Sequence, residues 1–85
     1  MNTIHLVDVL GDPSGAPRLY RGRPVVATFA FAGVPPPRAL VCLPGGSWQI
    51  RETVEVVVRQ DWQCDVYVAC AAASVPHPDA EAPVA

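Results

Sequence analysis

The chain has 85 residues, 51% of them hydrophobic, which is enough for one small folded domain and argues against a disordered chain. Arginine supplies all six basic residues, and the formal net charge of −2 comes from Asp79 and Glu81 near the C-terminus. A neutral body lacks the basic face that phosphate contacts require, so we expect no nucleic-acid partner.

Neither a membrane anchor nor a signal peptide is evident in the sequence. The longest uncharged run, residues 24–37, contains prolines that exclude a membrane-spanning helix. The first residues lack both the basic segment and the long apolar segment of a signal peptide. We therefore expect a cytoplasmic location, or a virion if the source is viral.

Ten prolines separate short apolar runs, a pattern typical of strands and turns. The first strand is expected over residues 3–10, where a bulge near Leu6 and Val7 would repair an imperfect alternation that leaves Asp8 beside apolar residues. A short strand is expected over residues 17–20. A stronger strand is expected over residues 24–32, with Phe29 and Phe31 on its core face.

The middle of the chain predicts an extended linker at residues 33–37 and further strands over residues 39–43, 47–51 and 52–60. The last of these either continues its predecessor or follows a bend. Trp48 and Ile50 share one strand face, so we expect both in the core.

Residues 53–70 predict a β-hairpin whose alternation selects its register. A two-residue loop at 61–62 would place Val58 opposite Asp65. A three-residue loop at 61–63 instead places opposite charges and apolar pairs across from each other, which favours this register by roughly 0.2–1 kcal/mol per pair. Its predicted pairs are Val58 with Val66, Val56 with Val68, Val54 with Cys70, Arg59 with Asp65 and Val57 with Tyr67. The face that carries Val54, Val56 and Val58 is predicted to be core.

Together these elements predict an all-β fold: a small single-domain β-sandwich or barrel of about six short, mostly antiparallel strands over residues 1–74. Residues 75–85 form a Pro/Ala-rich extended tail without periodicity. Such a tail would be disordered alone, and we expect it to become ordered on a neighbouring subunit, with Pro76 and Pro78 in the contact.

Metal and catalytic chemistry have little support. The set Cys42, Cys64, Cys70 and His77 has the composition of a zinc site, but no two of these residues have the close spacing of paired zinc ligands. Cys64 and Cys70 lie about 20 Å apart along one strand, so they share neither an ion nor a disulfide. We predict buried, reduced thiols and no metal or cofactor; a disulfide from Cys42 to one of the other two stays open.

The two histidines, His5 and His77, accompany no nucleophile motif, and the sequence has no phosphate-binding loop. The prediction is therefore a protein that is not an enzyme.

Two features could bind a partner. Trp62 at the hairpin tip either folds back onto the strands or is an exposed aromatic anchor. Arg18, Arg21 and Arg23, which Arg38 could extend, are either solvated loop arginines or a docking patch for an acidic protein surface.

These observations favour a non-enzymatic assembly protein that binds neighbouring protein subunits, either copies of itself or parts of a larger particle. A virion shell, with the chain as a decoration or minor structural protein, is the expected setting. The alternative is a small soluble inhibitor or adaptor that binds one protein target through Trp62 and the three arginines.

Overall fold

The computed structural model describes residues 1–73, so the predicted contacts of Pro76 and Pro78 lie outside the described residues. Strands account for 60% of the structure and no α-helix forms in the described part, which confirms the all-β prediction. The strands are β1 (Asn2–Asp8), β2 (Leu19–Tyr20), β3 (Arg23–Phe31), β4 (Leu40–Leu43), β5 (Gly46–Val58) and β6 (Cys64–Ala72). Residues 1–73 contain no helix that is long and apolar enough to cross a membrane.

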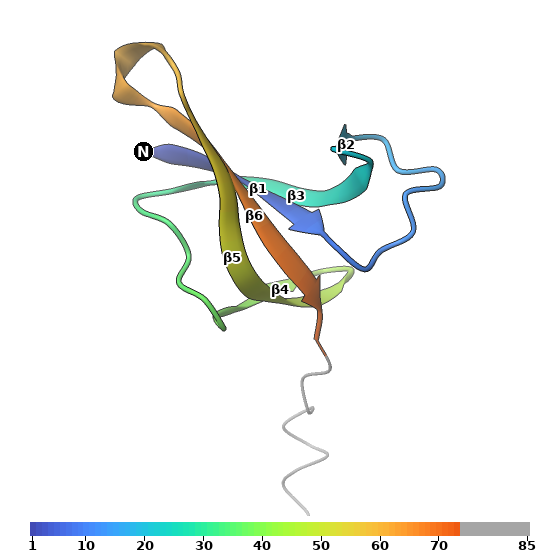
Figure 1. Cartoon of the computed structure of the whole chain (residues 1–85). Helices are drawn as coiled ribbons and strands as arrows, with labels where there is room; N and C mark the ends of the chain where they lie inside the picture. Colours follow the sequence, from blue (N-terminus) through green and yellow to red (C-terminus); the bar gives the residue numbers. More distant parts are fainter. Residues whose placement is uncertain (74–85) are drawn as a thin grey trace, which may run out of the picture.

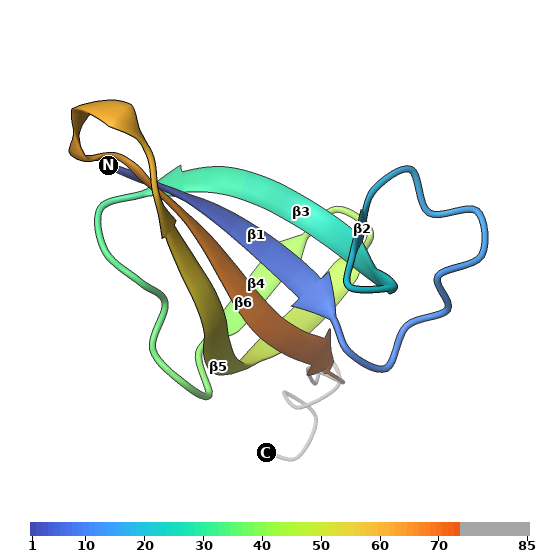
Figure 2. The same ribbon diagram turned by 45° about the horizontal axis from the view of Figure 1, so that its top comes forward.

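All six strands belong to one mixed sheet with the order β2-β3-β1-β6-β5-β4 (Figure 1). Four neighbouring pairs are antiparallel, as expected, whereas β1 and β6 at the centre run parallel. The sheet is open, so the predicted sandwich or barrel is not confirmed. It is strongly curved instead, and β4 lies behind the central strands in Figure 2.

The core lies on the concave side of this sheet. It is built from Ile4 and Leu6 of β1, Ile50 of β5, and Val66, Val68 and Cys70 of β6. Phe29 of β3, Val41 of β4 and Trp48 of β5 pack against it. The predicted core positions of Phe29, Trp48 and Ile50 and the inward face of β6 are confirmed. The predicted core position of Phe31 is wrong: it is 40% exposed, because it lies at the end of β3 beside Asn2.

A bulge occurs where the sequence predicted one, but on the other strand. Leu6 pairs with Ala27 and Val7 pairs with Val25, so the extra residue is Val26 of β3. Because β1 itself keeps its alternation, Asp8 stays on the core side opposite Cys70.

The hairpin of β5 and β6 has a different register from the predicted one. Val56 pairs with Val66 and Val58 with Cys64, two residues away from the expected partners. The loop is three residues long, as predicted, but it comprises Gln60–Trp62 and begins one residue earlier. The physical reason is that β5 has register shifts at 50/52 and 53/55, so that no single alternation runs along its whole length.

The predicted core position of the hairpin valines is wrong. β4 pairs with β5 only over residues 46–49, and the far half of β5 therefore has a neighbouring strand on one side only. Figure 1 shows this end of the hairpin projecting from the sheet. We call this projecting part the hairpin arm; its exposed apolar side chains are Val54, Val56, Val57, Val58 and Trp62.

Candidate functional site

The hairpin arm presents apolar side chains to solvent on both faces of its strand. Trp62 is 92% exposed and Val58 is 69% exposed. Of the two possibilities for Trp62, folding back onto the strands is wrong and the exposed position is confirmed. Solvated aromatic and aliphatic groups in one patch are typical of surfaces that bind another protein.

Backbone geometry at the tip holds Trp62 away from the body. Asp61 and Trp62 both have φ near +63°, in the left-handed region that favours glycine and that bulky residues rarely adopt. The chain is closed behind them by the Arg59 N–H group, which donates to the Gln63 carbonyl at 2.6 Å. A tryptophan in such a conformation costs the fold roughly 1–3 kcal/mol of backbone strain.

The three predicted arginines are exposed, yet each has a partner within the chain. The Arg18 guanidinium donates to Thr28 Oγ1 at 2.7 Å. That of Arg21 lies 3.4 Å from a Glu55 carboxylate oxygen, and Arg23 donates to the backbone carbonyl of Val9. These contacts connect the loop before β3 to the body of the domain, and docking by these arginines stays a prediction.

Beneath that loop, three rings form a stack on the face of the sheet opposite the core. The His5 ring lies 4.6 Å from the Tyr67 ring, and the Tyr67 ring lies 4.1 Å from the Tyr20 ring, both nearly parallel. The Tyr20 hydroxyl donates to Glu55, which raises the pKa of the Tyr20 phenol. The stack thereby joins β1, β6, β2 and β5.

Hydrogen bonds determine which nitrogen of His5 carries the proton. Nδ1 lies 3.1 Å from the Arg18 guanidinium, and because arginine only donates, Nδ1 must accept. The proton is then on Nε2, which donates to Asp65 Oδ1 at 3.0 Å. Arg59 contacts the other oxygen of Asp65 at 3.5 Å, so the predicted Arg59–Asp65 pair is present, although the two residues are diagonal neighbours.

A hydroxyl, an imidazole and a carboxylate do lie in series here, since His5 Nδ1 is 3.2 Å from Thr28 Oγ1. This is the order of groups in a hydrolytic triad. However, Arg18 donates both to the hydroxyl oxygen and to the nitrogen that would have to remove its proton. In addition, the apolar pocket lined by Phe29 and Phe31 lies on the opposite, concave face. The cluster is therefore better explained as a clamp that fixes the loop before β3.

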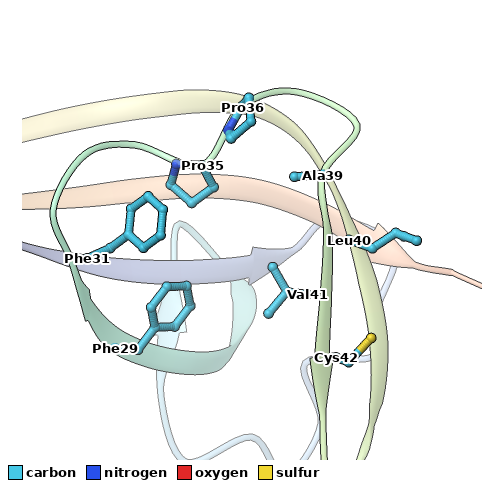
Figure 3. A pocket seen from close by; sticks show the side chains of 8 residues that line it. All are labelled: Phe29, Phe31, Pro35, Pro36, Ala39, Leu40, Val41 and Cys42. Atoms are coloured by element: carbon cyan, nitrogen blue, oxygen red, sulfur yellow. The ribbon is translucent and has the colours of Figure 1, made fainter.

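The concave face carries an open apolar pocket of about 380 Å³ between β3 and β4 (Figure 3). Phe29 and Phe31 form one wall, with their rings 6.4 Å apart in an edge-to-face arrangement. The remaining lining residues come from β4 and the segment before it: Pro35, Pro36, Ala39, Leu40, Val41 and Cys42. Pro35–Pro37, expected to be only a linker, thus also contributes to a surface.

The cysteines differ in their surroundings. Cys70 is buried, as predicted, and burial together with the nearby Asp8 carboxylate raises its pKa to about 12. Cys42 is exposed on β4, so its predicted burial is wrong. All three cysteines are free thiols, and within residues 1–73 no three acidic, histidine or cysteine side chains are grouped to hold a metal ion.

Sequence reasoning missed the His5 cluster and the pocket. Comparison with protein-family models found no match, and searches among curated proteins and solved structures found no similar protein.

Proposed function

We propose that this protein is a non-enzymatic assembly subunit that binds neighbouring protein subunits through the hairpin arm. The observation that carries this proposal is the group of five apolar side chains exposed on the end of a hairpin that projects from the sheet: four valines of β5 and Trp62 in the turn. Natural proteins usually protect such strands with charges, prolines or a covering element. On this arm the valines and Trp62 stay exposed although Glu55 and Arg59 lie among them, which favours a partner that covers them.

The backbone of the arm supports the same proposal. Along Glu52–Val58, β5 pairs with β6 on one side and has no strand on its other side within the described residues. A partner strand could add to this edge, with main-chain hydrogen bonds contributing affinity and the alternating valines contributing specificity.

The alternative of an inhibitor that binds through Trp62 and the three arginines has less support. Each of those guanidinium groups already has a partner within the chain. Moving them to an outside surface would first cost these internal contacts.

Trp62 should dominate the binding energy. An aromatic side chain of its size buries about 150–250 Å² in an interface, and truncation of a central tryptophan typically costs about 2 kcal/mol or more. A Trp62→Ala substitution should therefore weaken partner binding by about 30-fold or more.

The test is to express the tagged 85-residue chain in the cells that encode it, cross-link it and quantify the bound proteins by mass spectrometry. We expect stoichiometric protein partners with the wild-type chain and their loss with Trp62→Ala and Val56→Glu. Leu10→Ala, which alters an exposed leucine outside the arm, is the matched control and should retain them. Identical partners at identical yield with all four chains would refute the proposal.

A further inference from the structure

We infer that the apolar pocket between β3 and β4 receives Trp62 of a second copy of this chain. The inference rests on the proposed function, because it identifies the partner that the hairpin arm binds. One chain then carries both halves of the contact: an aromatic anchor on the arm and a receptor on the concave face.

The pocket has the chemistry that an indole ring requires. Its lining is almost entirely apolar, and its volume of about 380 Å³ falls in the range of pockets that bind small ligands. Phe29 and Phe31 lie on one side of it, as Figure 3 shows. Aromatic rings bind one another in edge-to-face or offset stacks, so an inserted indole gains contacts beyond simple burial.

Charges beside the two halves are complementary. Asp61 precedes Trp62 at the tip of the arm, and Arg38 lies between the lining residues Pro36 and Ala39. Both charged residues are exposed, and neither forms an ion pair within residues 1–73. Docking of the arm would bring a carboxylate toward a guanidinium, a pairing that fixes orientation as well as partner choice.

Backbone conformation adds a parallel between the two halves. Arg38 has φ +72° and Asp61 has φ +63°, so each charge is presented from a left-handed residue. Strained conformations of this kind cluster at functional sites such as ligand clamps. The resulting contact is between two different surfaces, each of which is present once per chain.

The first experiment measures self-association of the purified 85-residue chain by sedimentation velocity over a range of concentrations. We expect the wild type to associate and both Trp62→Ser and Phe31→Glu to associate at least tenfold more weakly, since the Phe31 ring points into the pocket in Figure 3. Leu19→Glu is the matched control: Leu19 is 55% exposed and Phe31 is 40% exposed, but Leu19 lies on β2, outside the pocket. It should associate like the wild type.

The second experiment mixes the two weakened variants. The Trp62→Ser chain keeps an intact pocket and the Phe31→Glu chain keeps an intact arm, so the mixture should form a 1:1 heterodimer. Two damaged copies of a single shared surface would not complement each other in this way.

Charge reversal provides a test that does not touch the apolar core. Arg38→Asp and Asp61→Arg should each weaken association, and the chain carrying both changes should recover it. Arg38→Asp suits its left-handed backbone, since aspartate tolerates positive φ better than most residues. Circular dichroism of every variant excludes unfolding as the cause of weaker association.

Three outcomes would overturn the inference. A wild-type chain that stays monomeric, while a Trp62-dependent partner is found in cells, would refute self-docking and leave the proposed function intact. Association that survives Trp62→Ser but disappears on removal of residues 74–85 would assign the pocket to that segment instead. Failure of the mixed variants and of the double charge reversal to recover association would show that Trp62 and the pocket do not meet.

Discussion

Trp62→Gly is the substitution that separates what the hairpin tip contributes to folding from what it contributes to binding. With φ near +63°, Trp62 occupies a conformation that costs a residue with a side chain about 1–2 kcal/mol. Glycine adopts the same conformation at no steric cost. Two consecutive left-handed residues are also the pattern of tight hairpin turns that favour aspartate followed by glycine.

Little stability should be lost with the indole itself. Because 92% of its surface is already exposed, the buried remainder is about 20 Å² and contributes about 0.5 kcal/mol. Glycine also raises the conformational entropy of the unfolded chain, which lowers the free energy of unfolding by a further amount of about 0.4–1 kcal/mol. The relief of strain offsets these losses, so we expect Trp62→Gly to be about as stable as the wild type.

Comparison with Trp62→Ala gives the sharper result. Both variants lack the indole, but alanine retains the left-handed strain, so the glycine variant should be more stable by about 1 kcal/mol. In a chain of this size that difference shifts the thermal midpoint by about 4–8 °C. Urea unfolding measures the difference in free energy between the two variants. It is followed by the fluorescence of Trp48, which is then the only tryptophan, at a protein concentration too low for association.

Two results would refute this reasoning. If the alanine variant were the more stable, residue 62 would not be left-handed in solution. If both variants lost more than about 2 kcal/mol, the indole would pack against the domain and would not be available to a partner.

Three further predictions concern the body of the domain. Asp65→Ala leaves the buried Nε2–H group of His5 without an acceptor and should lower the free energy of unfolding in urea by about 1–3 kcal/mol. Arg59→Ala removes only an ion pair made by an exposed arginine and should lower it by less than about 1 kcal/mol. Equal losses would contradict the assigned hydrogen bond. The pKa of the Cys70 thiol is about 12 in the folded protein and ordinarily 9.0, so on raising the pH the unfolded state loses this proton first. The free energy of unfolding should therefore fall from about pH 9 upward, by at most about 1.4 kcal/mol per pH unit. Cys70→Ala should lack this component, and the same alkaline slope in both proteins would argue against it. Gly11→Ala would place a Cβ atom 2.6 Å from a carboxylate oxygen of the buried Asp8 and should lower the thermal midpoint. An unchanged midpoint would show that the loop containing Gly11 shifts freely.

Local alternation was sufficient to predict most of the strands. The apolar period of two identified five of the six strands closely, and it identified the inward side chains Phe29, Val66 and Val68. It also indicated a bulge near Leu6 and Val7, although the extra residue lies on β3 and Asp8 stays on the core side. These features depend on neighbouring residues, which is why a sequence can reveal them.

Features that depend on distant residues were not predictable in this way. The predicted valine core assumed that other strands accompany the whole hairpin, but β4 stops short of the arm. The His5 cluster requires the parallel pairing of His5 with Tyr67, and no local pattern specifies that two strands so far apart in the chain are neighbours. The pocket likewise requires the curvature that brings β4 toward Phe29.

The central position of β1 beside β6 has a consequence for how the protein is made. During translation β1 emerges well before its neighbour β6, which ends at Ala72, so the middle of the sheet stays incomplete until nearly the whole described chain has emerged. Pairing between such remote segments gives a high contact order, and folds of this kind take milliseconds to seconds. Until β6 pairs with β1, Ile4 and Leu6 are exposed. The nascent chain should therefore depend on chaperones more than a sheet of consecutive hairpins would.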